Sequence, residues 1–166
     1  ILDGGAISLF AASQFELPEA RLVFTPHQKE WEKLSGLDLE SQTEDKSRKA
    51  VQSFPQGTVI VEKGPHTRIW ASGQEEGYQL DVGGPYQATG GMGDTLAGMI
   101  AGFAGQFPQV SLYERVVVAT YLHSAIAEDL SKEVYVVLPT TISQEIPKWM
   151  KKWSDKDQVT STENRK

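Results

Sequence analysis

The sequence contains no cysteine and no apolar run long enough to span a bilayer. The lack of cysteine excludes disulfides and thiolate metal sites and is typical of a reducing compartment, so we expect a cytoplasmic protein. The longest apolar runs, such as Val134–Leu138, are far shorter than the roughly 20 residues of a membrane-spanning helix. A secretory signal would show a basic segment, an apolar stretch and a small-residue cleavage site, and no such pattern is present.

Positive charge is also scarce, because 16 Lys and Arg against 22 Asp and Glu give a formal net charge of −6. A surface of this sign does not suit nucleic acid or an anionic membrane, so we expect neither partner, and any anionic ligand must be held locally. The length of 166 residues, with 39% hydrophobic residues and 15 glycines, fits one globular domain. We assign residues 1–153 to that domain and expect residues 154–166, which are polar and lack apolar periodicity, to form a disordered tail.

The sequence opens on Ile1 rather than Met, and Ile1–Gly5 is typical of a buried strand that ends in a loop. We therefore expect a domain that is entered partway through. Further along, the apolar patterns predict alternating strands and helices, and hence an α/β sheet with helices on its faces and a ligand site where strands end. The predicted strands are residues 21–24, 58–61, 68–71 and 78–80, and the predicted helices are 25–36, one around 50–54, one from near residue 94, and 112–130. Residues 133–138 are either a strand or a connection.

The first predicted helix has a clear start signal in Thr25-Pro26-His27-Gln28. Thr25 can cap the helix, Pro26 suits the first helical position, and Gln28 has capping-box spacing from Thr25. The polar residues 38–49 that follow this helix are interpreted as a solvated face. Glu30 is expected to pair with Lys29 or Lys33 on its own helix.

The most chemically informative segment is the glycine-rich loop Gly90-Gly91-Met92-Gly93, which opens a predicted helix. Several backbone N–H groups can converge there ahead of the positive helix end, and that geometry suits phosphate. Asp94 follows directly, where a carboxylate can accept the proton of an attacking hydroxyl during phosphoryl transfer. The alternative is that Asp94 only caps the helix and the glycines only make a turn, and the residues alone leave both interpretations open.

The full run from Gly83 to Gly102 closely resembles the signature of the ADP- or ATP-dependent NAD(P)H-hydrate dehydratase family. Thr25-Pro26-His27 with Glu30, and the segment Val61–Thr67, agree with that family in order and spacing. The resemblance implies a ribokinase-like three-layer α/β sandwich, with a central, mostly parallel sheet flanked by helices and without its N-terminal part. It also implies an enzyme that uses ADP or ATP with Mg²⁺ to phosphorylate the ring hydroxyl of NADH hydrate or NADPH hydrate and then eliminates phosphate. A homo-oligomer, such as a tetramer, is expected.

The same resemblance assigns roles to individual residues. Asp94 corresponds to the catalytic base that contacts the hydrate, and His27 to a second hydrate contact. No residue is assigned as a dedicated metal ligand. The residues that correspond to the nucleotide site are Lys63, Gly64, Pro65, His66, Thr67, Gly90, Gly91, Met92 and Gly93.

Two positions depart from the family pattern, because Gly5 stands where the second of two carboxylates is usual and Gly84 where an asparagine is usual. Without the resemblance, His27 would be interpreted as a solvated or cap-supporting residue and Lys63 as a surface charge. His123 is interpreted as a hydrogen-bonded core or interface residue. Asp3 is interpreted as a cap for the segment that follows it. Two other functions stay open: a sugar or vitamin-precursor kinase of the same fold, and a nucleotide-binding module without turnover.

Overall fold

The computed structural model describes residues 1–13 and 20–163, with side chains described as far as Asp155. Helices and strands alternate as predicted only as far as residue 62, because residues 59–79 hold three consecutive strands and the elements from residue 85 to residue 163 are helices. The elements are α1 (Gly5–Ala12), β1 (Val23–Phe24), α2 (Gln28–Ser35), the 3-10 helix η1 (Leu39–Ser41), α3 (Glu44–Val51), β2 (Val59–Glu62), β3 (Arg68–Ala71), β4 (Tyr78–Gln79), the 3-10 helix η2 (Pro85–Gln87), α4 (Met92–Gln106), α5 (Leu112–Leu130) and α6 (Pro139–Glu163).

The four strands form one sheet in the order β1-β2-β3-β4. β1 pairs with β2 in parallel, and Leu2 adds a parallel bridge to Phe24 on the other side of β1. The pairs β2–β3 and β3–β4 are antiparallel, so the described sheet is mixed and not mostly parallel as expected. Short turns join these strands, and a short turn can connect only antiparallel neighbours.

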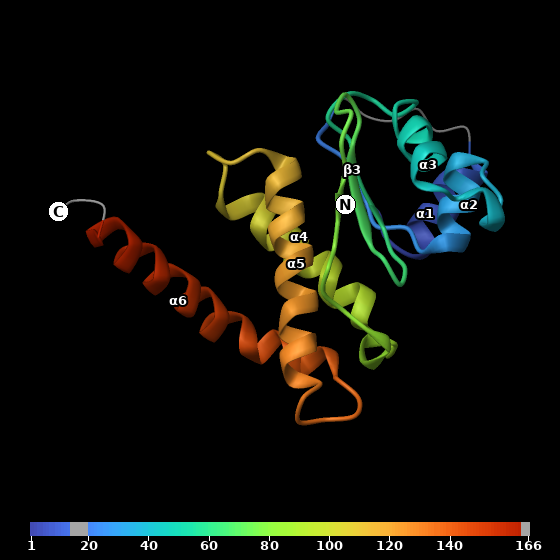
Figure 1. The fold of residues 1–166 in the computed structure, drawn as a ribbon. Coiled ribbons are helices and arrows are strands. Elements are labelled where there is room, and N and C mark those ends of the chain that lie inside the picture. Colours follow the sequence, from blue (N-terminus) through green and yellow to red (C-terminus); the bar gives the residue numbers. More distant parts are fainter. Residues whose placement is uncertain (14–19, 164–166) are drawn as a thin grey trace.

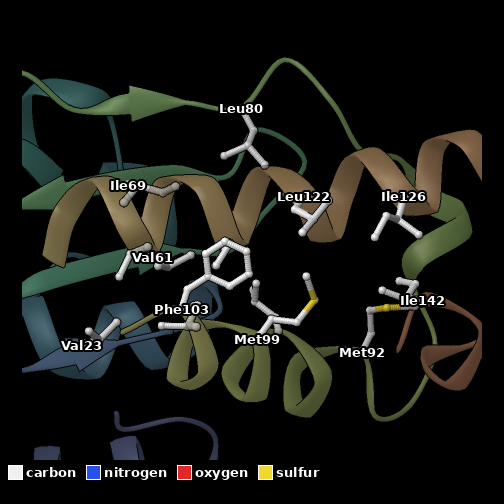
Figure 2. Close-up of a cluster of buried hydrophobic side chains, with 14 of the residues drawn as sticks. Val23, Val61, Ile69, Leu80, Met92, Met99, Phe103, Leu122, Ile126 and Ile142 are labelled. Carbon is white, nitrogen blue, oxygen red and sulfur yellow. The ribbon is translucent and has the colours of Figure 1, made fainter. Parts of the chain in front are cut away.

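Helices cover both faces of the sheet, which confirms the three-layer α/β architecture (Figure 1). Side chains alternate along β2 and β3, and each strand serves two hydrophobic clusters. Val61 and Ile69 point into the cluster formed with α4, α5 and α6, whereas Ile60 and Trp70 point into the cluster formed with α1, α2 and α3. Figure 2 shows the first cluster, in which sheet residues meet methionines and Phe103 of α4.

The start of α2 differs in detail from the prediction. The N-cap is His27 rather than Thr25: the ring Nδ1 of His27 accepts from the backbone N–H groups of Lys29 and Glu30. Glu30 closes the capping box by accepting from the His27 N–H at 2.9 Å, so its carboxylate serves the cap and not Lys29 or Lys33. Thr25 is instead fully buried. The helix ends as predicted at Gly36, whose φ of 73° is the left-handed C-cap conformation that glycine adopts readily.

Helix α3 begins at Glu44, inside the segment that was interpreted as a solvated face. One position of this polar segment faces inward: Ser47 is fully buried, accepts from Trp31 Nε1 at 3.0 Å and donates to Glu62 Oε1 at 3.2 Å. Glu62 also accepts from Arg68 and from Trp70 Nε1. This buried network ties α3 to α2 and the sheet, because each polar group in it has a partner.

The C-terminal segment also differs from the prediction of a disordered tail at residues 154–166. Helix α6 continues through Glu163, and residues 164–166 lie outside the described residues. Trp149 and Trp153 pack against the cluster that includes α5, with Trp153 lying 6.3 Å from the ring of Tyr121. Extending a helix that packing has already nucleated costs little, so a polar sequence can continue it. Within the described residues no helix is both long and apolar enough to cross a membrane.

Candidate active site

Three parallel-running segments end side by side at one edge of the sheet. Leu2 bridges Phe24, and His27 bridges Lys63, in parallel register. The backbone N–H of Lys63 donates to the carbonyl of Pro26 at 2.8 Å. Asp3, the Thr25–His27 segment and Lys63 therefore project from the carboxyl ends of adjacent strands, which is where open α/β sheets bind ligands.

Asp3 and Lys63 form an ion pair at this edge, with Lys63 Nζ 2.8 Å from Asp3 Oδ1. The same carboxylate oxygen accepts from the Thr25 hydroxyl at 2.6 Å. Burial raises the pKa of the Asp3 carboxyl, but the hydrogen bonds from Lys63 and Thr25, the Lys63 charge and the Gly4 N–H outweigh it, so the pKa lies below its ordinary value. Asp3 is therefore a carboxylate at neutral pH, at a position where the sequence predicts only a cap.

The glycine loop meets this ion pair from the other side. Gly91 has a φ of 83°, the left-handed region that favours glycine, and is the N-cap of α4. A Cβ at Gly93 would lie 3.4 Å from Lys63 Nζ and 3.7 Å from Asp3 Oδ2, so the loop backbone and the ammonium group are in contact range. The side chain of Met92 is buried in the core, and its backbone N–H already donates to the Thr89 carbonyl at 3.3 Å.

Asp94 lies in the first turn of α4 and is exposed to solvent. Its carboxylate has no hydrogen-bond or ion-pair partner in the described part of the chain, and α4 has no side-chain cap bond. The interpretation of Asp94 as a side-chain cap is therefore wrong for this structure. An unpaired carboxylate next to an amide cradle is free to accept a proton from a bound hydroxyl.

The segment from Lys63 to Thr67 forms a turn beside the loop. The Thr67 hydroxyl donates to the carbonyl of Gly64 at 3.2 Å and accepts from its N–H at 3.4 Å, which closes the turn on itself. This turn borders a pocket of about 280 Å³. The pocket is lined by Gln28, Glu62, Lys63, Gly64, Pro65, His66, Arg68 and Gln79.

The structure places His27 at the same sheet edge as Lys63, with 55% of its side chain exposed. Its Nδ1 caps α2, and its Nε2 lies 3.4 Å from Glu30 Oε1. The ring orientation is therefore set by the capping box, while more than half of its surface stays accessible. His27 can cap the helix and contact a ligand at the same time.

His123 of α5 is buried, with 4% exposure, as expected for a core residue. Burial lowers its pKa to about 4, against a smaller raising effect of its hydrogen bond with the Met92 backbone. Its Nε2 has no hydrogen-bond partner in the described chain. The ring is thus neutral at pH 7, and its hydrogen bond with the Met92 backbone contacts the first residue of α4.

The two departures from the family pattern have different surroundings. A Cβ at Gly5 would meet nothing within 4 Å, so a carboxylate would fit sterically at the start of α1. A Cβ at Gly84 would lie 2.5 Å from Cε1 of Tyr86, so the Tyr86 ring occupies the space that a side chain there would need. A side chain at position 84 would therefore require the Tyr86 ring to move.

Taken together, a sheet with helices on both faces and a glycine loop with an aspartate at its strand ends define a ribokinase-like protein. One solved structure it resembles is that of a ribokinase-like superfamily protein from Enterococcus faecalis, with a TM-score of 0.83 and 46% identity over 91% of this chain and 51% of that one. The family model described as NAD(P)H-hydrate dehydratase matches residues 1–148. The chain belongs to this family.

Two further relatives carry functional names. The ADP-dependent (S)-NAD(P)H-hydrate dehydratase of Streptococcus pneumoniae is 66% identical over 91% of this chain and 52% of its own length. A structure of the ADP/ATP-dependent NAD(P)H-hydrate dehydratase from Bacillus subtilis, co-crystallized with ATP/Mg²⁺, has a TM-score of 0.72 and 29% identity over 90% of this chain and 53% of that one. The chain spans about half the length of the curated relatives it matches.

Proposed function

We propose that the protein dehydrates the (S)-hydrates of NADH and NADPH in a nucleotide-dependent reaction, with ADP as the donor. The named relatives support the substrate and the donor, since the 66% identical protein is called ADP-dependent. The structural observation that supports the chemistry is the juxtaposition of three groups: the Gly90–Gly93 amides, the Lys63 ammonium and the unpaired Asp94 carboxylate.

In this proposal the terminal phosphate of the nucleotide binds at the glycine loop. Backbone N–H groups at the start of α4 and the positive helix end would stabilise its negative charge, and Lys63, which is ion-paired with Asp3, would place its ammonium group beside Gly93. Gly64, Pro65 and His66 line a pocket together with Lys63, and the segment from Gly64 to Thr67 would hold the rest of the nucleotide. His27, exposed at the same edge, would contact the hydrate.

Asp94 then acts as the base. Its carboxylate takes the proton of the ring hydroxyl as that oxygen attacks the terminal phosphorus, and the bond from phosphorus to the nucleotide oxygen breaks. In the second step the C–O bond of the phosphate ester breaks, phosphate leaves with the electron pair, and loss of a proton from the adjacent carbon restores the ring double bond. The products are the nucleotide shortened by one phosphate, inorganic phosphate and the reduced dinucleotide.

Magnesium would enter with the nucleotide. No group of three or more acidic or histidine side chains that could hold a metal occurs among the described residues. Mg²⁺ in phosphoryl-transfer sites is commonly held by one or two carboxylates together with the phosphates themselves, and a site of that kind needs no such group. In this proposal the phosphates carry the ion, which would neutralise charge on the transferred group, and Asp94 stays free to act as the base.

The substitution Asp94→Asn, made in the full-length protein, tests the proposal. Asparagine keeps the size of the side chain but cannot accept the proton, so kcat for the hydrate should fall by about 10²–10⁴-fold, with nucleotide affinity changed only a few-fold. Asp129→Asn on α5, which removes an exposed carboxylate paired with Lys132, is the matched control and should turn over like the wild type. Wild-type turnover in Asp94→Asn would rule out the base.

Product analysis separates this proposal from the two alternatives. A dehydratase releases inorganic phosphate together with the absorbance of the reduced nicotinamide ring. A sugar or vitamin-precursor kinase would instead accumulate a stable phosphorylated alcohol, and a binding module would bind nucleotide without releasing phosphate. Either of those results with the wild-type chain would contradict the proposal.

A further inference from the structure

Asp3 makes contacts that a helix cap would not need. Its Oδ1 accepts from both the Thr25 hydroxyl at 2.6 Å and Lys63 Nζ at 2.8 Å. Its Oδ2 lies 3.7 Å from the Cβ position of Gly93. The carboxylate thus lies between the buried end of β1, the end of β2 and the glycine loop, and joins three segments that are far apart in the sequence.

The ion pair determines where the Lys63 ammonium lies. A lysine side chain has four flexible carbons and loses rotamer entropy when it is held in one place. Here both partners are mostly covered, with side-chain exposures of 23% for Lys63 and 19% for Asp3. Thr25, which is fully buried, holds the carboxylate in turn through its hydroxyl.

The contact with Gly93 places the ammonium group of Lys63 at the glycine loop. The ammonium lies 3.4 Å from where a Cβ of Gly93 would be, so it is held against the backbone of the loop and not in open solvent. A phosphate on the loop amides would meet the positive charge already in place. Without Asp3, the lysine would have to be recruited from a range of rotamers for each turnover.

We infer that Asp3 is a positioning residue for phosphoryl transfer, which acts by holding the Lys63 ammonium at Gly93. This inference rests on the proposed function, because it assigns the transferred phosphate to that loop. Asp3 itself does not need to touch the phosphate. Its effect therefore requires Lys63, and this dependence can be measured.

A double-mutant cycle in the full-length protein tests whether the effect of Asp3 depends on Lys63. Asp3→Asn keeps an acceptor for the Thr25 hydroxyl but removes the charge that holds Lys63, so we expect kcat to fall by about 10- to 100-fold, with the nucleotide KM changed by less than about threefold. Lys63→Gln should lose at least as much, and the double variant should match Lys63→Gln within about twofold. Asp129→Asn, from an ion pair of the same 2.8 Å length, is the control and should leave kcat unchanged.

Additive losses in the double variant would show that Asp3 acts independently of Lys63 and would overturn the inference. An unchanged kcat in Asp3→Asn or in Lys63→Gln would also overturn it. If Asp3→Asn does not fold, Asp3→Glu provides a second variant, since it keeps the charge and shifts the carboxylate by one methylene. The inference then requires a kcat below that of the wild type and above that of Lys63→Gln.

A labelling experiment separates this inference from the proposed function. Acetic anhydride modifies free lysine amines, and the extent at Lys63 can be read by peptide mass spectrometry. Release from the ion pair should raise the labelling rate of Lys63 several-fold in Asp3→Asn but not in Asp129→Asn. If the wild type does not turn over the hydrate, the proposed function fails, and labelling still decides whether Asp3 holds Lys63. An unchanged rate at Lys63 would contradict the inference.

Discussion

The two aspartates near the glycine loop show how differently one residue type behaves at the scale of single side chains. Asp94 is exposed and unpaired within the described chain, whereas Asp3 is mostly covered and holds a lysine and a threonine. A base needs an oxygen that is free to take a proton, and a positioning group needs partners that fix it. The surroundings therefore distinguish the proposed roles, although both residues follow apolar or glycine-rich segments in the sequence.

His123 gives a pH prediction at the same scale. Its pKa is about 4 in the folded chain against an ordinary value of 6.5, so the unfolded chain binds the proton more readily between these values. The unfolding free energy should therefore be unaffected by His123 above about pH 6.5 and should fall as the pH drops towards 4. The full loss corresponds to about 3 kcal/mol.

Chemical denaturation at pH 7 and pH 4.5 measures this effect. Carboxylates also titrate near pH 4, so the informative quantity is the difference in pH dependence between the wild type and His123→Gln, which lacks the titrating group. The variant should lose less stability on acidification than the wild type. Identical pH dependence in both proteins would show that the buried ring is not the source.

At the scale of elements, α2 combines a helix start with a residue that the family resemblance assigns to the substrate. His27 caps the helix through Nδ1 and leaves more than half of its side chain exposed. His27→Ala should lower the unfolding free energy by about 1 kcal/mol, because the first-turn N–H groups lose their acceptor. His27→Ser restores an acceptor and should recover most of that stability, which thermal melts of both variants would show.

Turnover of the same two variants tests whether His27 also binds the hydrate. A cap alone predicts that His27→Ser behaves like the wild type in both stability and KM. A hydrate contact predicts a raised KM for the hydrate in both variants, including the one with restored stability. A wild-type KM in His27→Ser would therefore leave the helix cap as the role of this residue.

At the scale of the whole molecule, the described sheet belongs to two hydrophobic clusters at once. Ile60 and Ile69 lie on adjacent strands and are fully buried, but they point to opposite faces. Because neighbouring positions on β2 serve both clusters, loss of either cluster removes support for the other. We expect the two sides of the sheet to unfold together.

Large-to-small substitutions on each face test this cooperativity. Ile60→Ala and Ile69→Ala should each lower the unfolding free energy by about 2–5 kcal/mol, through lost burial and an added cavity. In both variants tryptophan fluorescence and circular dichroism should report one coincident transition. Leu9→Ala, at a side chain that is 66% exposed, should change stability by less than about 0.5 kcal/mol. Separate transitions for the two faces would contradict the shared-sheet interpretation.

The sequence by itself was sufficient for the strands, for α2, α4 and α5 and for the family, whereas α1 and α6 were not predicted and α3 begins earlier than predicted. The strands near residues 23, 60, 70 and 78 lie within a residue or two of their predicted positions, and α5 has the predicted bounds Leu112–Leu130. Apolar periodicity, caps and glycines act over three or four residues, so a sequence pattern can specify them. The glycine loop with Asp94 at a helix start is local in the same way, which is why it could be predicted.

Only the tertiary structure decided which of these elements meet. Asp3 and Lys63 are 60 residues apart in sequence, and their ion pair exists because Leu2, β1 and β2 run in parallel to the same edge. The mixed sheet and the length of α6 depend in the same way on neighbours distant in sequence. Such contacts form when both faces of the sheet are packed at once, and no pattern within a few residues encodes that condition.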